Sequence, residues 1–512
     1  MPQFVAVRWP YRRARPPGVE LREPYAPFRA RSSPFLGRAE KFTRKRDGGS
    51  EPVRSLGMGA RLAAETLAAR AAAGLSRLAG RGGGTTLPGK LLWKLDPGSI
   101  DALASRLPLG SALVSATNGK TTTVAMAARI LGGRTRLAWN SAGANLVSGV
   151  ASALLAAGDA ELGLFEADEG ALPEIARRAR PRAVCLGNLF RDQLDRYGEL
   201  EHVAEGWRAA VAELGEDAAV VLNADDPLVA DLGRAHGHAV LFGLDDPRWA
   251  RPALQHAADS KYCLRCGTPY AYAAAYVGHL GDYRCPSCGH GRPALDVAAR
   301  RLELDGLDGA SFDLVTPAGS TRVRLPLPGL YNVYNAIAAA ALAQQLGAGL
   351  DEIRAGLEGF RAAFGRFERI PVGDRTILVL LVKNPAGANE IVRTLEQSAP
   401  KTLLLALNDA TADGRDVSWI WDVDLEPLLA GAETVVVSGE RAAELGLRCL
   451  YGGLDRSALV VEPDLERALE IGLALVPSRG ELPVLPTYTA MLALRALVAG
   501  RGLVAPYWER GR

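Results

Sequence analysis

The sequence predicts an α/β protein with two parallel-sheet domains and a small cysteine-rich insert, and three patterns support that prediction. Short apolar segments alternate with Ala-rich helical stretches from about residue 101, which is typical of βαβ units around a parallel sheet. The alternation breaks at about residue 258, where Tyr, Cys and Gly become dense, and it resumes near residue 294. A second alternating set begins after about residue 366. With 512 residues, 48% of them hydrophobic, the chain can fill the cores of two or three domains.

The strand candidates and the domain limits follow from this alternation. The first set has strand candidates at residues 112–115, 162–166, 183–187, 218–222 and 239–242. The second set has five, at residues 377–382, 402–407, 434–437, 459–461 and 482–485, which suggests a Rossmann-like domain. The predicted organisation is a basic lead at 1–57, a helical segment at 58–100, a central domain at 101–365 with its insert at 258–293, and a C-terminal domain at 366–512.

Positive charge is concentrated at the start of the chain. Residues 1–56 contain thirteen Lys and Arg against five Asp and Glu, although the formal net charge of the whole chain is only +3. The remainder is therefore slightly acidic, which argues against a globally basic nucleic-acid binder. The Arg- and Pro-rich lead lacks the apolar region of a secretory signal, so we expect either a disordered tail or a start codon placed too early, with Met58 the true beginning.

A candidate phosphate-binding loop lies between the first strand candidate and the following helix. The run LVSATNGKTT at 113–122 has the context in which backbone N–H groups at a helix N-terminus bind phosphate. Lys120 would reach the β- and γ-phosphates, and the Thr121 hydroxyl would ligate Mg²⁺. The general G-x-x-x-x-G-K-[ST] motif is not met because Val114 holds its first position, so a chance strand–turn–helix remains the alternative. The candidate nucleotide-binding residues here are Thr117, Asn118, Gly119, Lys120, Thr121 and Thr122.

Four of the six cysteines form two Cys-x-x-Cys pairs separated by eighteen residues, which is a strong zinc signature. The four are Cys263, Cys266, Cys285 and Cys288. Four thiolates make a closed tetrahedral site, so the predicted role is structural. Gly267 and Gly289 would permit the tight turns that such a site needs. A redox pair and a nucleic-acid-binding knuckle are the alternatives for these four cysteines. Cys185 and Cys449 lie in apolar segments, so we expect them to be ordinary buried thiols.

An Asp-rich loop at residues 408–422 follows a strand end in the second set. It contains four carboxylates and two Trp. Ligands of open α/β sheets bind outside the carboxyl ends of the strands, so this loop is a candidate site. A rigid contact loop between domains is the alternative.

The motifs of the central domain resemble those of the Mur ligases. TNGKTT at 117–122 has the form found in Mur ligases and folylpolyglutamate synthetases, and the segment at 188–198 is similar to their N-x-x-x-D-H-L-D motif, with Gln193 in place of His. Glu166 ends a strand where Mur ligases place a Mg²⁺-binding carboxylate; a solvated acidic turn is the alternative.

The same resemblance gives roles to three further residues. Asn332 and Asn335 match the H-N-x-x-N helix start that contacts adenine in the family, although helix capping alone would also explain Asn332. Arg366, in the segment GRFE, would lie near the phosphates.

Three C-terminal strings narrow the resemblance to the MurT family. They are KNPAG at 383–387, LNDATADGRDVSWIWD at 407–422 and PTYTAM at 486–491. Too few residues precede the phosphate loop for the UDP-sugar domain of amino-acid-adding Mur ligases. The MurT family also lacks that domain and carries a zinc ribbon with four cysteines.

Resemblance to the MurT family implies a two-subunit amidotransferase. A GatD-type glutaminase partner would supply ammonia, and this chain would use ATP and Mg²⁺ to phosphorylate the α-carboxylate of D-glutamate in the lipid II stem peptide, giving D-isoglutamine. Lys120 and either Asp413 or Asp416 are the catalytic candidates, the aspartate orienting a histidine of the partner. The expected location is the cytoplasm, at the inner face of the membrane. A folylpolyglutamate- or cyanophycin-type ligase and a zinc-ribbon nucleic-acid-binding NTPase are the alternative functions.

Overall fold

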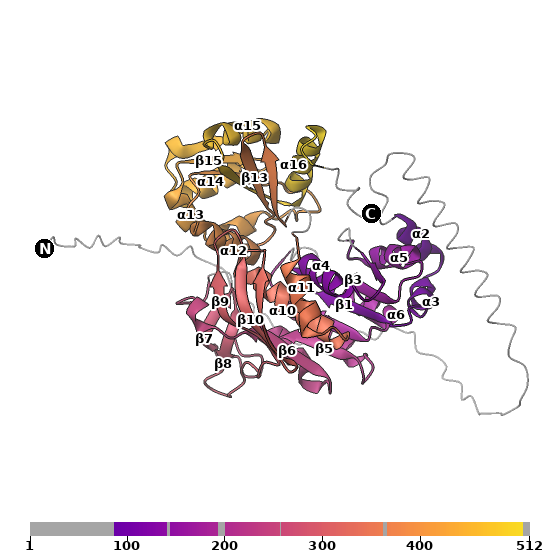
Figure 1. Ribbon diagram of the computed structural model, residues 1–512. Helices are drawn as coiled ribbons and strands as arrows, with labels where there is room; N and C mark the ends of the chain where they lie inside the picture. The colour runs from indigo at the N-terminus through magenta and orange to yellow at the C-terminus, as the bar shows by residue number, and fades with distance from the viewer. Residues whose placement is uncertain (1–86, 141–143, 193–199, 256–257, 362–365, 505–512) are drawn as a thin grey trace, which may run out of the picture. The chain divides into compact units, whose positions relative to one another are not determined.

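The computed structural model describes residues 87–140, 144–192, 200–255, 258–361 and 366–504. Within these residues the chain forms two large sheets and a two-stranded hairpin (Figure 1). The basic lead, Met58, most of the expected 58–100 helical segment and Gln193 lie outside the described residues. The domain limits given above remain predictions.

The larger sheet is a nine-stranded, mostly parallel sheet with the order β11-β10-β9-β6-β5-β4-β1-β3-β2. Neighbours from β9 to β2 pair in parallel, while β10 and β11 extend the sheet in antiparallel pairing. The five expected strands are all present. The strands are β1 (Ser111–Ser115), β2 (Leu137–Trp139), β3 (Leu162–Glu166), β4 (Ala183–Leu186), β5 (Ala219–Asn223), β6 (Ala239–Leu244), β9 (Val297–Leu304), β10 (Ala310–Thr316) and β11 (Gly319–Leu325).

Helices cover both faces of this sheet. Alternate strand residues point to opposite faces, so Val114 and Leu164 pack with α4 and α10, whereas Leu113 and Phe165 pack with α5 and α6. The helices are α2 (Leu87–Leu95), α3 (Ser99–Ala104), α4 (Lys120–Leu131), α5 (Val147–Ala156), α6 (Leu172–Ala179), α8 (Leu200–Ala212), α9 (Pro227–Leu232), α10 (Leu330–Gln345) and α11 (Leu350–Glu358), with short 3-10 turns η1 (Gly233–Ala235) and η2 (Pro247–Trp249).

The cysteine-rich insert folds as an antiparallel hairpin. Its strands are β7 (Ala271–Val277) and β8 (Leu280–Arg284). The first Cys-x-x-Cys pair precedes β7 and the second follows β8, so both pairs lie at the open end of the hairpin.

The second sheet has six strands rather than the five expected, in the order β12-β13-β17-β14-β15-β16. The additional strand, β12 (Arg366–Val372), lies at the predicted start of the C-terminal domain, in a segment that contains charged residues and Pro371. It pairs antiparallel with β13 at the sheet edge, where proline is tolerated. The others are parallel: β13 (Arg375–Leu380), β14 (Thr402–Ala406), β15 (Thr434–Ser438), β16 (Leu459–Val461) and β17 (Glu481–Pro486).

Helices also cover both faces of the second sheet. On one face, Leu403 and Leu405 belong to the core formed with α12, α13 and α14. On the other face, Leu404 and Val436 belong to the core formed with α15 and α16. These helices are α12 (Pro385–Glu396), α13 (Glu426–Gly431), α14 (Ala442–Tyr451), α15 (Leu465–Leu475) and α16 (Tyr488–Gly500), with 3-10 turns η3 (Ser418–Asp422) and η4 (Arg456–Ala458). In the described part of the chain, no helix has both the length and the apolar character needed to cross a bilayer.

Candidate active site

The expected phosphate loop connects the end of β1 to the first residue of α4. Gly119 adopts a φ of +90°, and a Cβ at this position would lie 1.9 Å from Asn335 Oδ1. Only glycine fits both the left-handed backbone and the close neighbour. Thr117, Lys120 and Thr122 are buried, and Thr121 is half-buried. The strand–loop–helix context predicted from the sequence is therefore present.

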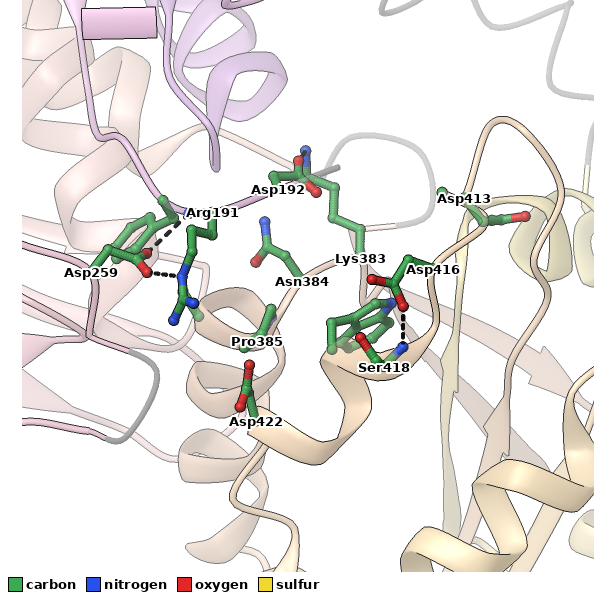
Figure 2. Close-up of a pocket in the computed structure, with 14 residues that line it drawn as sticks. Arg191, Asp192, Asp259, Lys383, Asn384, Pro385, Asp413, Asp416, Ser418 and Asp422 are labelled. Atoms are coloured by element: carbon green, nitrogen blue, oxygen red, sulfur yellow. Dashed lines mark hydrogen bonds and ion pairs between the residues drawn. The ribbon is translucent and has the colours of Figure 1, made fainter. Parts of the chain in front are cut away.

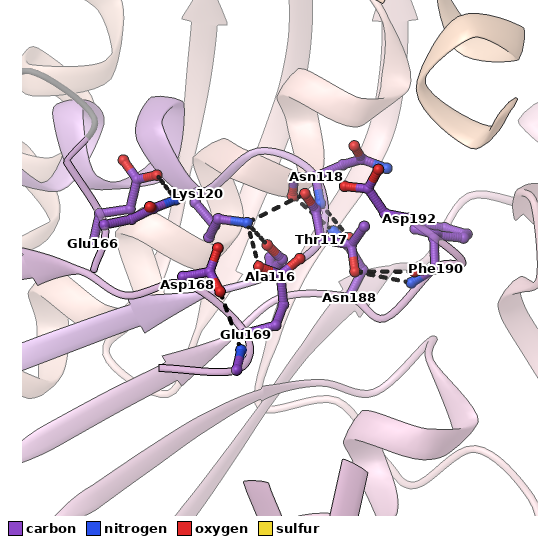
Figure 3. A network of polar contacts seen from close by, with 12 residues as sticks. Ala116, Thr117, Asn118, Lys120, Glu166, Asp168, Glu169, Asn188, Phe190 and Asp192 are labelled. Atoms are coloured by element: carbon purple, nitrogen blue, oxygen red, sulfur yellow. Dashed lines mark hydrogen bonds and ion pairs between the residues drawn. The ribbon is translucent and has the colours of Figure 1, made fainter. Parts of the chain in front are cut away.

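The segment that follows β4 holds the phosphate loop in shape (Figure 3). The Thr117 backbone N–H donates to the Asn188 carbonyl at 2.8 Å, and the Asn118 N–H donates to the Asn188 side chain at 2.9 Å. The Asn188 side-chain amide donates to the Asn118 carbonyl at 3.0 Å. The Phe190 N–H donates to Thr117 Oγ1 at 3.1 Å. The N-x-x-x-D motif thus supports the loop through its first and third residues, Asn188 and Phe190.

Lys120 forms a buried ion pair with Glu169. Its ammonium lies 2.8 Å from Glu169 Oε2 and donates to the carbonyls of Ala116 and Thr117, and both charged side chains are at most 8% exposed. Burial alone would raise the pKa of Glu169, but the positive charges of Lys120 and Lys383 outweigh it and lower that pKa. The sequence analysis missed Glu169, although it lies in the acidic string with Glu166.

Glu166 is fixed at the end of β3 by two asparagines. Its backbone N–H donates to Asn140 Oδ1 at 2.8 Å, the Asn140 amide donates to the Glu166 carbonyl at 2.8 Å, and Asn145 Nδ2 lies 3.4 Å from Glu166 Oε1. Glu166, Asp168 and Glu169 are all buried, with exposures of 3%, 7% and 7%. A solvated acidic turn is therefore excluded for this segment. A buried carboxylate beside a phosphate loop is a suitable ligand for Mg²⁺.

Asn332 and Asn335 lie near the start of α10. Asn335 Oδ1 accepts from Thr123 Oγ1 on α4 at 3.4 Å, and the same oxygen lies against Gly119 of the phosphate loop. Asn332 donates to the Pro328 carbonyl at 2.8 Å and accepts from Asn335 at 3.3 Å. The N-cap position belongs to Gly329, so Asn332 is not the capping residue. Contact with adenine remains a prediction, and the side chain of Arg366 lies outside the described residues.

Figure 2 shows the lining of a polar cavity of about 200 Å³, and Asn384 in that lining contacts the phosphate loop. Asn118 and Asn384 join the two through a reciprocal pair of amide hydrogen bonds of 3.2 and 3.0 Å. Asn384 also caps α12, accepting from the Gly387 N–H at 2.9 Å. The Lys383 ammonium contacts Asp192 Oδ2 at 2.6 Å. The cavity lining is Phe190, Arg191, Asp192, Asp259, Lys383, Asn384, Pro385, Ala386, Asp413, Gly414, Asp416, Ser418, Trp419 and Asp422.

The two candidate aspartates of the Asp-rich loop have different surroundings. Both carboxylate oxygens of Asp413 are occupied by Thr489, through its N–H at 2.8 Å and its hydroxyl at 2.5 Å, and Asp413 is only 7% exposed. Asp416 is exposed, and its Oδ1 accepts from the Ser418 N–H at 2.9 Å. Hydrogen bonds from Ser418 hold the pKa of Asp416 below its usual value, so Asp416 is an ionised carboxylate at neutral pH.

The four cysteines converge as a zinc site requires. Their sulfurs all lie within 4.8 Å of one another, with Sγ–Sγ distances of 3.5 Å for Cys263–Cys288 and 3.4 Å for Cys266–Cys285. A tetrahedron with Zn–S bonds of ~2.3 Å has edges of about 3.8 Å, so the four positions fit Zn²⁺. Gly267 and Gly289 adopt φ values of +71° and +74°, as expected for the two turns.

The remaining two cysteines are unsuited to nucleophilic chemistry. Cys185 and Cys449 are buried, and burial raises the pKa of each thiol to about 12. A cysteine nucleophile reacts as the thiolate, which neither residue forms at neutral pH.

Comparisons with known proteins agree with this architecture. A family model described as MurT ligase C-terminal matches residues 381–491, and one described as Mur ligase middle domain matches residues 114–282. Among solved structures, a pseudomurein peptide ligase type C from Methanothermus fervidus shares the fold with a TM-score of 0.63 at 21% identity, covering 78% of this chain and 80% of that one. A MurF ligase from Thermotoga maritima in complex with ADP has a TM-score of 0.56 at 16% identity, covering 81% and 85%.

Relatives match at least four fifths of the chain. The lipid II isoglutaminyl synthase (glutamine-hydrolyzing) subunit MurT of Streptococcus pneumoniae is 32% identical over 446 residues, which are 84% of this chain and 95% of that protein. The subunit MurT of Staphylococcus aureus is 31% identical over 414 residues, which are 80% of this chain and 91% of that protein. With the central and C-terminal family models also matched, the chain belongs to the MurT family of Mur-type ligases.

Proposed function

We propose that this chain is the ATP-dependent ligase subunit of a lipid II isoglutaminyl synthase. Its relatives over 84% and 80% of the chain carry that name. The observation that carries the proposal is the Asn118–Asn384 contact, which joins the phosphate loop to a cavity rich in carboxylates. A nucleotide at the loop and a substrate carboxylate in the cavity would be neighbours, as phosphoryl transfer requires.

The proposed reaction has two steps. A carboxylate oxygen of the D-glutamate residue attacks the γ-phosphorus of ATP, and ADP leaves. Ammonia then attacks the acyl carbon, inorganic phosphate leaves, and the nitrogen loses a proton. The acidic cavity lining can accept this proton, and the burial of Lys120, Glu166 and Glu169 limits water that would hydrolyse the acyl phosphate.

The described residues have distinct roles in this scheme. Backbone N–H groups at Gly119 and the start of α4 bind phosphate, while Asn188 and Thr117 keep the loop in shape. We place Mg²⁺ at Glu166 and Thr121, where it would neutralise charge on the phosphates. Lys120 must exchange Glu169 for phosphate oxygens, so Glu169 sets how readily the ammonium is released.

A second subunit would supply the ammonia. The two isolated cysteines are buried and burial raises the pKa of each thiol, which disfavours a glutaminase nucleophile in the described part of this chain, and the relatives are named as subunits of a glutamine-hydrolysing enzyme. We propose a GatD-type glutaminase as partner and the exposed Asp416, rather than Asp413, as the carboxylate that orients its histidine. Structural Zn²⁺ at the four cysteines and action on lipid II at the cytoplasmic face of the membrane complete the proposal.

Reconstitution tests this function directly. The full-length chain, co-purified with a GatD-type glutaminase, is given lipid II and ATP, with either glutamine or ammonium chloride, and the stem peptide is analysed by mass spectrometry. We expect D-isoglutamine with both nitrogen sources and ADP release in step with amidation. Amidation that needs no ATP, or ATP hydrolysis without amidation in the complete mixture, would contradict the proposal.

A further inference from the structure

We propose that the tip of the β7–β8 hairpin positions the phosphate loop, with His279 as the positioning residue. This inference rests on the proposed nucleotide site. In this proposal the cysteine-rich insert has a role in nucleotide binding in addition to holding a structural metal.

His279 is fully buried at the hairpin tip, between β7 and β8. Its ring centroid lies 4.7 Å from that of Phe190, with an interplanar angle of 53°. The Asp259 N–H approaches His279 Nδ1 at 3.4 Å, and the Tyr272 hydroxyl donates to the His279 carbonyl at 2.9 Å. The tip is therefore held from its own hairpin and inserted against the segment that follows β4.

A buried carboxylate joins the hairpin tip to that segment. His279 Nε2 lies 3.4 Å from Asp226 Oδ2, and both side chains have zero exposure. The same oxygen accepts the Leu189 N–H at 2.8 Å, while Asp226 Oδ1 accepts the Leu228 N–H at 3.0 Å as the cap of α9. Asp226 thus fixes Leu189, and His279 occupies the space beside that carboxylate.

The contacts continue to the phosphate loop without a gap. Phe190, which packs on His279, donates its N–H to Thr117 Oγ1 at 3.1 Å. Asn188, just before Leu189, makes the three hydrogen bonds to Thr117 and Asn118 described above. Removing the imidazole would leave a cavity against Phe190 and Asp226, and closely packed interiors transmit such a change to their neighbours.

The cysteine pairs explain why the tip can serve as a support. Both pairs lie at the open end of the hairpin, so a metal held there would tie the two strands together and stiffen the element that carries His279. His290 lies near that end, with Nδ1 2.7 Å from the Tyr270 hydroxyl, and is also buried, at 4% exposure. It provides a matched histidine in the same insert, and its two ring nitrogens face Tyr270 and Asp231 instead of the segment that follows β4.

The test measures Mg·ADP binding by calorimetry to the full-length chain and three variants, with zinc content and melting temperature recorded for each. We expect His279→Ala to weaken Mg·ADP binding on the order of tenfold, the size seen for residues that act through their neighbours. His279→Gln, which keeps a polar head near Asp226, should restore most of the affinity, and His290→Ala should bind as the wild type does. In the amidation assay His279→Ala should raise the KM for ATP with little change in kcat.

A double-mutant cycle with Thr117→Val separates positioning from general destabilisation. If His279 acts through Phe190 and Thr117, the effects of the two substitutions on binding will be non-additive. Additive effects, or wild-type affinity in a folded His279→Ala, would overturn the inference. Should His279→Ala fail to fold, Phe190→Leu decides: it removes the stacked ring but keeps the N–H, and unchanged affinity would be the overturning result. Absence of Mg·ADP binding in the wild type would instead refute the proposed nucleotide site.

Discussion

The buried Lys120–Glu169 pair gives a prediction in which stability and nucleotide binding respond in different ways. Lys120→Ala leaves the Glu169 carboxylate in a site where its side chain is 8% exposed. Removing one partner of a buried ion pair costs about 3–5 kcal/mol. The Glu169 carboxyl group can instead take up a proton. At pH 7.5, roughly three units above an ordinary carboxyl pKa, this protonation costs about 4 kcal/mol, which sets an upper limit on the loss of unfolding free energy.

We therefore expect Lys120→Ala to destabilise the protein by about 2–4 kcal/mol, with Lys383 reducing the loss by its charge. Glu169→Gln should cost less, roughly 1–3 kcal/mol, since Lys120 keeps the carbonyls of Ala116 and Thr117. The double variant Lys120→Ala/Glu169→Gln removes both charges, and its loss of stability should be smaller than the sum of the two single losses by a coupling of about 0.5–3 kcal/mol.

Urea unfolding followed by circular dichroism measures these losses, and Mg·ADP titration of the same proteins measures binding. Lys120→Ala should bind poorly, whereas Glu169→Gln should bind more tightly than wild type because phosphate no longer competes with a carboxylate for the ammonium. The lowered Glu169 pKa also predicts a pH dependence: its stabilising contribution is present above the ordinary carboxyl pKa and is lost as the pH falls through the lowered value. Additive unfolding losses together with weaker binding in Glu169→Gln would refute this reasoning.

Three further outcomes are expected. Zinc analysis should find one Zn²⁺ per chain, and Cys285→Ser should lower zinc content and soluble yield; a zinc-free, fully stable wild type would contradict the site. Asp416→Asn should reduce glutamine-dependent amidation but not amidation with ammonium chloride, and equal loss with both nitrogen sources would place Asp416 in the ligase chemistry. Asp413→Asn should instead lower the melting temperature, because it disturbs the bonds to Thr489. Asn384→Ala removes both the α12 cap and the contact with Asn118, so we expect it to reduce the free energy of Mg·ADP binding and the free energy of unfolding by about 1 kcal/mol each. Mg·ADP affinity equal to that of the wild type would show that the Asn118 contact does not serve nucleotide binding.

Local patterns in the sequence were sufficient to predict much of this architecture. Buried parallel strands are continuous apolar runs, so all five expected strands of the first set are present. Paired Cys-x-x-Cys spacing is equally local, and the four sulfurs converge as predicted. The strand β12 was missed because its charged residues and Pro371 are typical of a loop, and only its edge position permits them.

Long-range pairing explains what the sequence could not reveal. Glu169 lies 49 positions after Lys120 in the chain, and the two become partners only because β3 and β1 are neighbours in the sheet. Asn384 meets Asn118 across 266 positions. The sequence alone does not distinguish Asp413 from Asp416 in this loop; in the structure Asp413 is the buried carboxylate because it bonds to Thr489 on α16, whereas Asp416 is exposed.

The order of strands explains why these distant residues meet. The chain crosses from β1 to β2, returns to β3, and then places β4 on the other side of β1, so the connections run in opposite directions from the β1–β4 pair. Such a reversal opens a crevice outside the carboxyl ends of the two strands. The phosphate loop leaves β1 there and the Asn188 segment leaves β4 there, which is why they form the hydrogen bonds that shape the loop. The hairpin tip contacts that same β4 extension through His279 and Asp226, so under the proposed role of the insert a displacement of the tip would reach the phosphate loop through one intervening segment.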